Sequence, residues 1–206
     1  MFSDIAIPKN NEAEFAEIAS KLGLRKLYFL YSFDEYNQDD IKKKLDSINN
    51  KKINLKIGFL VNQKNISNAM QHSKLLAAKS SDKDRLFIEG KKIKLIYGFE
   101  ELNKKDYIHQ RASWLNHILC ELAGKNNIFV GFSYSSLFNK SGTATSMLIG
   151  RMMQNIRLCR KYKVKTAIGA FSEKPFDLRA HHDVMSLFNL FGMDNKTIKD
   201  SMAFDM

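Results

Sequence analysis

The sequence predicts an α/β fold of the TIM-barrel-like class, a compact barrel of about seven parallel strands surrounded by helices. Seven β-rich runs alternate with amphipathic segments along the 206 residues. Most of these runs are continuously apolar, which is typical of parallel strands that are covered on both faces. A spacing of about 29 residues between runs suits one βα unit each. No Gly-x-Gly-x-x-Gly follows the first run, so a barrel is favoured over an open dinucleotide-binding sheet.

The strands and the first helix can be placed along the chain. Asn11 is expected to cap this helix with Glu14 as its reciprocal partner, and Gly23 is expected to end it in a left-handed conformation. Its apolar stripe consists of Phe15, Ile18, Ala19 and Leu22. The predicted strands are, in order, Asp4–Ile7, Lys26–Tyr31, Ile53–Val61, Lys74–Ala78, Ile93–Tyr97, Ile128–Phe132 and Thr166–Phe171.

Two later helices have recognisable apolar faces. One is predicted near Tyr107–Ala123 with its end at Gly124, and the other near Ala144–Tyr162. The expected buried faces are Ile108, Ala112, Leu115, Leu119 and Leu122 in the first helix, and Leu148, Met152, Ile156 and Cys159 in the second. Because no linker, repeat or low-complexity stretch interrupts the pattern, we expect residues 1–206 to form a single domain.

The composition excludes several classes of protein. An apolar fraction of 44% with 11% aromatic residues is too high for a disordered chain. Two cysteines are too few for a secreted disulfide scaffold. The first residues show no basic flank before an apolar stretch, and no run reaches about 18 apolar residues, so we expect neither a signal peptide nor a membrane partner. These features favour a cytoplasmic protein.

The formal net charge of +11 concerns the partners of the protein rather than its fold. Nucleic acid is the leading candidate partner, because each neutralised phosphate releases counterions and strengthens binding. However, 26 of the 33 cationic residues are lysines, and the chain is also rich in asparagine. A compositional bias from an AT-rich genome produces the same excess, so the charge alone leaves both interpretations open.

The predicted strand ends, where a barrel enzyme carries its active site, show no catalytic constellation. There is no His-x-His or Cys-x-x-Cys in the sequence. His181 and His182 are adjacent, so on a helix they point about 100° apart and cannot bind one ion together. Cys120 and Cys159 fall within helical patterns, which is typical of buried, unreactive thiols. We therefore predict no catalytic residue and no metal site in this chain.

One loop has the position of a phosphate-binding element. Residues Ser141-Gly142-Thr143-Ala144-Thr145-Ser146 lead directly into a predicted helix, whose free N–H groups attract anions. The motif lacks the lysine of a P-loop. Helix capping by Thr143 or Ser141 is the alternative interpretation.

The helix that follows this loop carries a more specific signal. Arg157, Arg160 and Lys161 are spaced i, i+3, i+4 and project away from its predicted buried face. Arg151 lies near the edge of that face. No acidic residue occurs from residue 142 to residue 166, although a solvated helix face usually alternates both signs of charge. Arginines favour phosphate contacts because guanidinium binds phosphate with two hydrogen bonds. Stabilisation of the helix dipole explains part of the cluster locally.

Several segments resemble archaeal ribonuclease P protein component 3, a family similar to the eukaryotic thirty-kilodalton subunit of the same enzyme. They lie in the family's order along nearly the whole chain. The matching segments are Asp4-Ile5-Ala6-Ile7-Pro8, Ala19-Ser20-Lys21-Leu22-Gly23, Arg111-Ala112-Ser113-Trp114-Leu115-Asn116-His117, Ile128-Phe129-Val130-Gly131-Phe132-Ser133, Leu158-Cys159-Arg160-Lys161-Tyr162-Lys163-Val164, Leu178-Arg179-Ala180-His181-His182-Asp183-Val184 and Leu190-Phe191-Gly192-Met193.

The resemblance implies a noncatalytic subunit of ribonuclease P, the ribonucleoprotein that removes the 5′ leader from precursor tRNA. It implies a barrel related to the polymerase-and-histidinol-phosphatase superfamily. The implied partners are the ribonuclease P RNA and a small α/β protein subunit, in a heterodimer or heterotetramer, with precursor tRNA contacted indirectly. The protein is implied to bind no cofactor of its own, whereas the catalytic RNA uses Mg²⁺ for endonucleolytic hydrolysis.

These inferences lead to a set of expected RNA-contacting residues. We expect phosphate contacts from Arg157, Arg160 and Lys161, with support from Arg151 and Arg179. By resemblance, Arg111, Asn116 and His117 face the RNA or a partner protein, or form part of the framework.

Two alternative functions remain. The first is a metal-dependent phosphoesterase of the polymerase-and-histidinol-phosphatase type, with Asp4, Glu100 and Ser133 at positions where ligands would cluster. The family's first His-x-His motif is replaced here by Asp4-Ile5-Ala6. The second is a protein–protein scaffold whose positive charge only aids solubility.

Overall fold

Seven parallel strands form a single sheet in which each strand pairs with its neighbour in sequence. The computed structural model describes residues 2–204 except 36, 38–40, 42, 46, 47, 49–52, 104, 108, 139 and 141. The strands are β1 (Ser3–Ala6), β2 (Lys26–Ser32), β3 (Asn54–Leu60), β4 (Leu76–Lys79), β5 (Leu95–Tyr97), β6 (Phe129–Ser133) and β7 (Thr166–Gly169). All seven predicted strands are confirmed, and so is the TIM-barrel-like class.

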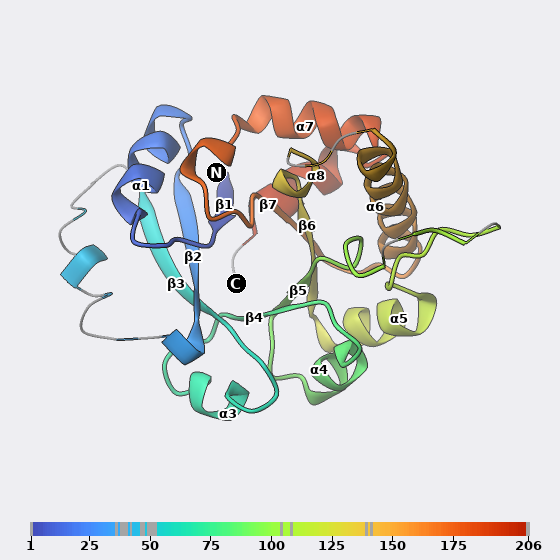
Figure 1. Cartoon of the computed structure of the whole chain (residues 1–206), viewed down its shortest axis with the longest axis horizontal. Helices are drawn as coiled ribbons and strands as arrows, with labels where there is room; N and C mark the ends of the chain where they lie inside the picture. The colour runs from blue at the N-terminus through green and yellow to red at the C-terminus, as the bar shows by residue number, and fades with distance from the viewer. Residues whose placement is uncertain are drawn as a thin grey trace.

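The sheet curls into a nearly closed barrel with helices around it (Figure 1). β1 meets the segment that follows β7 at only a few positions. The Phe171 N–H donates to the Ile5 carbonyl at 2.8 Å, and the Ile7 N–H donates to the Ser172 carbonyl at 2.9 Å. The carboxylate of Asp4 strengthens this seam, because its Oδ1 accepts the Ala170 N–H at 2.7 Å.

The inside of the barrel is filled by large side chains. The rings of Tyr97 and Phe171 stack with their centroids 4.3 Å apart. Gly131 makes room for them, since a Cβ at this position would lie 2.8 Å from the Tyr97 Cβ. Near the C-terminus, Phe204 packs against the Tyr28 ring and is buried in the same cluster. The interior is therefore a packed core and not a channel.

The helices lie outside the sheet, and apolar contacts with the strands bury their inner faces. They are α1 (Glu12–Lys21), α3 (Ile66–Ala69), α4 (Asp84–Gly90), α5 (His117–Asn126), α6 (Thr143–Lys161), α7 (His181–Leu190) and α8 (Asn195–Met202), with 3₁₀ turns η1 (Phe33–Glu35), η2 (Ser135–Leu137) and η3 (Pro175–Asp177). Within the described residues, none of these helices has the length and apolarity needed to cross a membrane.

The start of α1 differs from the prediction. Asn11 precedes the helix, but its side chain makes no capping hydrogen bond, so the expected capping box with Glu14 is wrong. Instead, Asn11 Oδ1 accepts the Lys9 N–H at 2.9 Å and its Nδ2 donates to the Glu173 carbonyl at 2.9 Å. The side chain thus ties the β1–α1 loop to the loop after β7. Gly23 adopts the predicted left-handed conformation with φ of 74°.

The helix predicted near Tyr107–Ala123 is also wrong in its bounds. Its first half is irregular, and α5 begins only at His117, where Asn116 Oδ1 accepts the Leu119 N–H at 3.0 Å. The helix then passes through Gly124 and ends at Asn126, and the capping residue Asn127 is left-handed with φ of 54°. Ile108, expected on its apolar face, lies outside the described residues. The irregular segment between β5 and α5 projects beside α6 (Figure 1).

Candidate nucleic-acid interface

The polar groups at the strand ends are engaged in holding the barrel together. Asp4 Oδ2 accepts the Tyr134 hydroxyl at 2.6 Å, while Ser133 Oγ donates to the Ala170 carbonyl at 2.9 Å. Glu100 accepts a hydrogen bond from Asn155 Nδ2 at 2.8 Å, beneath α6. Burial raises the pKa of Asp4 to about 6 and that of Glu100 to about 7. In the described part of the chain, no three His, Cys, Asp or Glu side chains are grouped so as to hold a metal ion.

The structure also places the two cysteines and most of the possible phosphate loop. Cys120 and Cys159 are both buried, as predicted. Ser141 of the possible phosphate loop lies outside the described residues. Gly142, with φ of 54°, occupies the N-cap position of α6 without a side-chain capping bond, so capping by Thr143 is wrong.

The predicted faces of α6 are confirmed. Leu148, Met152, Ile156 and Cys159 are buried against the barrel. Arg157, Arg160 and Lys161 are exposed near the C-terminal end of the helix, as the spacing predicted.

Arg151, however, is not a surface cation, and its expected contact with phosphate is wrong. Its side chain is only 2% exposed. Nε donates to Asp106 Oδ1 at 2.7 Å, and Nη1 donates to the backbone carbonyls of Glu100 and Asn103 at 2.8 and 2.7 Å. Arg151 therefore holds the segment after β5 against the side of α6 that faces the barrel. Arg151 is buried because it lies at the edge of the apolar stripe, where the segment after β5 covers it. The sequence pattern of α6 could not show this, since the partners of Arg151 come from a distant part of the chain.

Asp106 is the centre of this attachment. Its Oδ1 also accepts the Ala112 N–H at 2.8 Å, and its Oδ2 lies 3.8 Å from Arg111 Nη1. Burial acts to raise the pKa of Asp106, but the hydrogen bonds from Ala112 and Arg151 and the charges of both arginines outweigh it and hold this pKa below its usual value. The carboxylate thus stays ionised and bridges a buried guanidinium to an exposed one.

Gly150 allows Arg111 to lie directly on α6. A Cβ at residue 150 would be 1.9 Å from Arg111 Nη1, so any side chain there displaces the guanidinium. The Arg111 side chain is nevertheless 49% exposed. The guanidinium therefore rests against α6 while it remains available to a ligand.

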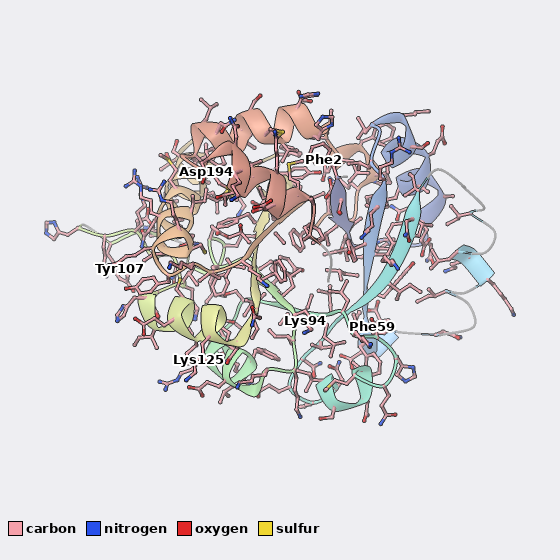
Figure 2. The ribbon with its side chains drawn as sticks, turned by 180° about the vertical axis from the view of Figure 1, so that it is seen from behind. Phe2, Phe59, Lys94, Tyr107, Lys125 and Asp194 are labelled. Atoms are coloured by element: carbon pink, nitrogen blue, oxygen red, sulfur yellow. The ribbon has the colours of Figure 1, made fainter. Side chains whose placement is uncertain are left out.

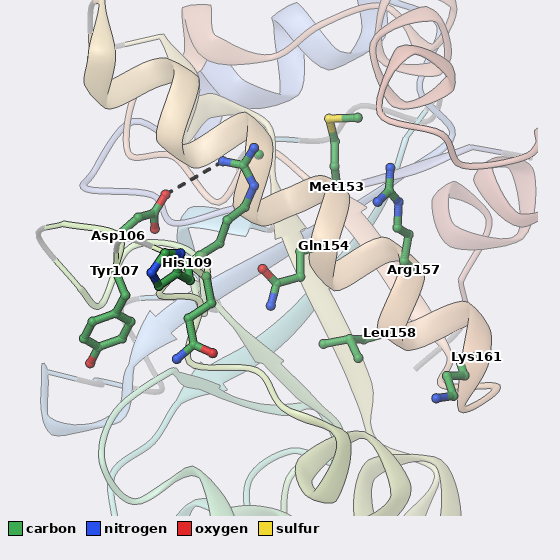
Figure 3. A pocket seen from close by; sticks show the side chains of 11 residues that line it. Asp106, Tyr107, His109, Met153, Gln154, Arg157, Leu158 and Lys161 are labelled. Atoms are coloured by element: carbon green, nitrogen blue, oxygen red, sulfur yellow. Dashed lines mark ion pairs between the residues drawn. The ribbon is translucent and has the colours of Figure 1, made fainter.

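The result is an open groove of about 750 Å³ between the irregular segment and α6. One stripe of α6 with i, i+3, i+4 spacing forms one side of it, and the segment contributes Asp106, Tyr107 and His109 to its lining (Figure 3; the dashed line is the ion pair of Asp106 with Arg111). We call it the arginine groove, and its lining is Asp106, Tyr107, His109, Gln110, Arg111, Gly150, Met153, Gln154, Arg157, Leu158 and Lys161.

A second hollow of about 450 Å³ continues the arginine groove on the other side of Gln110 and Arg111. We call it the tryptophan hollow, and its lining is Asn103, Tyr107, Gln110, Arg111, Ala112, Ser113, Trp114, Leu115, Asn116, His117, Gln154 and Leu158. The structure therefore brings Arg111, Asn116 and His117 together with Arg157 and Lys161 on one continuous surface.

Two predicted cations lie away from this surface. Arg160 lines a separate hollow with Lys163 and Lys165, between the end of α6 and the start of α8. Arg179 follows β7, at the carboxyl ends of the strands, whereas Arg157 and Lys161 lie at the end of α6 that leads into β7. The Arg179 guanidinium is 4.4 Å from the centre of the Phe138 ring, and its Nη1 donates to the Phe176 carbonyl at 2.6 Å.

Sequence reasoning missed Asp106, Tyr107, Gln154 and Gly150 as parts of the site. An isolated glycine inside a helical pattern was the one available signal, because such a residue often marks a close approach. The ion pair of Asp106 with Arg151 had no local signal.

Comparison with known proteins then identifies the family. A family model described as RNase P subunit p30 matches residues 1–204. The chain belongs to this family. The resemblance expected from the sequence is confirmed. Among its relatives in the p30 family, ribonuclease P protein component 3 of Thermococcus gammatolerans is 30% identical over 121 residues, which cover 59% of this chain and 53% of that protein.

Two further relatives of the p30 family carry the same name. That of Methanococcoides burtonii is 31% identical over 41% of this chain and 35% of its own length. The match to the burtonii and gammatolerans proteins thus spans about a third to a half of each. That of Methanothermobacter thermautotrophicus is 21% identical over 90% of this chain and 77% of its own length. A chain in a solved structure described as archaeal ribonuclease P with mature tRNA has a TM-score of 0.80 at 17% identity, covers 97% of this chain and 86% of its own, and confirms the fold.

Proposed function

We propose that this p30-family chain is a noncatalytic, RNA-binding protein subunit of ribonuclease P that supports the catalytic RNA in removing the 5′ leader from precursor tRNA. The observation that carries the proposal is the arginine groove, where Arg111, Arg157 and Lys161 meet on a chain of this family. The buried Arg151 and its partner Asp106 hold the groove in place, and exposed guanidinium groups bind phosphate well.

The proposal extends to partners and location. The chain pairs with the small α/β protein subunit, as a heterodimer or heterotetramer, and contacts precursor tRNA only through the assembled particle in the cytoplasm. It binds no cofactor, and Mg²⁺ serves the RNA component. The structure of the archaeal particle with mature tRNA contains a chain of the same fold, which supports this assignment.

Reconstitution tests the proposal directly. The ribonuclease P RNA is assayed for leader cleavage over a range of Mg²⁺ concentrations, alone, with this chain, and with this chain plus the small subunit. We expect the protein to lower the Mg²⁺ concentration needed for cleavage. Cleavage that does not respond to the chain under any of these conditions contradicts the proposal.

Replacing Arg157 and Arg160 by alanine is expected to reduce the salt dependence of binding to the ribonuclease P RNA. Each lost phosphate contact lowers the slope of log affinity against log salt by about 0.7 to 0.9. The measurement is a series of binding isotherms at increasing KCl. The matched control is Arg25→Ala with Arg85→Ala, which removes two exposed arginines from other elements. An equal loss of slope in both double variants would show that only total charge matters.

Gly150→Ala is expected to weaken RNA binding without lowering the stability of the fold. The new Cβ displaces the Arg111 guanidinium from its place on α6, so we expect RNA affinity to fall by about threefold to tenfold, as for the loss of one good phosphate contact. The guanidinium is the far end of a flexible side chain and alanine favours a helix, so the free energy of unfolding should be unchanged or rise by up to about 1 kcal/mol. Arg111→Ala should bind as weakly, and the double variant no more weakly than Arg111→Ala alone.

A further inference from the structure

Two exposed aromatic rings border the tryptophan hollow. Trp114 is 38% exposed and Tyr107 is 65% exposed, and Figure 2 shows Tyr107 at the outer edge of the molecule. Both line the hollow that continues the arginine groove. Large aromatic surfaces that remain in water beside a row of cations are the usual composition of a site for unpaired nucleic acid.

The backbone that presents Trp114 is firmly attached. The Trp114 N–H donates to the Phe99 carbonyl at 3.2 Å. Its neighbour Ser113 donates to Asn155 Oδ1 at 2.8 Å, and Asn103 Nδ2 donates to the Ala112 carbonyl at 2.7 Å. Ala112 and Leu115 are buried on either side. The ring therefore stands exposed on a rigid support, so little conformational entropy is lost when a flat ligand stacks on it.

The hollow also offers hydrogen-bonding groups of the kind that a base edge can pair with. The side-chain amides of Gln110 and Gln154 line both hollows. Among the described residues, neither amide has a hydrogen-bond partner. An amide carries both a donor and an acceptor, which matches the edge of a nucleobase. The volume of about 450 Å³ lies within the range of sites that hold small flat ligands.

We propose that the tryptophan hollow binds an unpaired nucleobase of the RNA whose backbone occupies the arginine groove. The inference rests on the proposed function and specifies the form of RNA that this surface accepts. Phosphates lie against Arg157 and Lys161, and the chain turns at Arg111 so that a base stacks on Trp114. A duplex cannot satisfy both hollows, because its bases are stacked on one another and paired. The surface therefore selects single-stranded or bulged RNA.

The experiment uses Trp114 as a reporter, since it is the single tryptophan of the chain. The full chain is titrated with oligouridylate, whose bases stack weakly on one another, and with the same strand annealed to oligoadenylate. We expect saturable quenching of the tryptophan fluorescence by the single strand, and little quenching by the duplex at concentrations where both are bound. Equal quenching by the two RNAs would overturn the inference.

Affinities of variants are measured in parallel with labelled ribonuclease P RNA and labelled oligouridylate. Trp114→Ala should weaken binding by about tenfold, the usual loss for one stacked base, with an unchanged salt slope. Trp114→Phe should keep the affinity within about threefold because a ring remains. Tyr107→Ala is a second variant in the same hollow. Because the Tyr107 ring is more exposed than that of Trp114, its removal is less able to disturb folding. The control is Phe176→Ala, which removes an aromatic ring that is 80% exposed at the strand ends.

The outcomes separate this inference from the proposed function. If Trp114→Ala binds RNA like the wild type while Arg157→Ala with Arg160→Ala still lowers the salt slope, the inference fails and the proposed function stands. If Trp114→Ala instead weakens binding of the small protein subunit alone, the hollow is a protein-docking surface and the inference also fails. If the wild-type chain binds neither RNA, the proposed function itself fails.

Discussion

Arg151→Met is expected to lower the free energy of unfolding by about 2–4 kcal/mol, because a buried guanidinium loses three charge-assisted hydrogen bonds. The substitution leaves the Asp106 carboxylate without its closest cation, which lies at 2.7 Å. It also leaves the carbonyls of Glu100 and Asn103 without a donor. Chemical denaturation followed by circular dichroism measures the change.

Arg157→Met is the matched control on the same helix. Its side chain is exposed, so we expect a change of no more than about 0.5 kcal/mol. Arg151→Lys should fall between the two, because an ammonium group cannot reach the carboxylate and both carbonyls at once. A variant Arg151→Met that unfolds like the wild type but binds RNA with a smaller salt slope would restore the interpretation of Arg151 as a phosphate contact.

The elements that could be predicted from the sequence are those specified by local patterns. The seven strands are confirmed because continuous apolar runs such as Lys26–Ser32 are buried on both faces whatever their neighbours. The exposed position of Arg157 and Lys161 follows from helical spacing alone. The family resemblance depended on such local segments too, spread in order along the chain.

The elements that could not be predicted depend on partners far away in the sequence. Arg151 has the position of a helix-edge cation, but Asp106 lies 45 residues before it and neutralises it inside the protein. The same carboxylate accepts the Ala112 N–H, so the apolar pattern that suggests a helix there is used by an irregular segment instead. The contact of Asp106 with Arg151 thus explains both wrong predictions, the exposed Arg151 and the early start of the helix. The same contact holds the segment against α6 and so forms the arginine groove.

The free energy of unfolding is expected to depend strongly on pH, because three carboxyl groups are buried and ionise with difficulty. Burial raises the pKa of Asp4 to about 6, of Asp84 to about 6 and of Glu100 to about 7. In the unfolded chain these groups titrate near pH 4, so between about pH 4 and pH 7 the folded state binds more protons. The free energy of unfolding should therefore fall as the pH rises through this window.

Asp106 has the opposite effect at lower pH. Its pKa is held below the usual value by the hydrogen bonds from Ala112 and Arg151, so the stability it supplies is lost as the pH falls below about 4. The two trends together place the maximum of stability near pH 4. Thermal or urea unfolding across pH 3 to 8 measures the profile.

Glu100→Gln isolates the largest of these contributions. Glutamine keeps the Oε1 that accepts the Asn155 Nδ2 hydrogen bond at 2.8 Å, but it cannot ionise. The variant should resemble the wild type near pH 4.5 and be more stable by about 2–3 kcal/mol at pH 8, since each unit of pKa shift corresponds to about 1.4 kcal/mol. Glu121→Gln, an exposed carboxylate on α5, should leave the profile unchanged. If Glu100→Gln keeps the wild-type slope between pH 5 and 7, the titrating group lies elsewhere, and Asp4 and Asp84 are the next to replace.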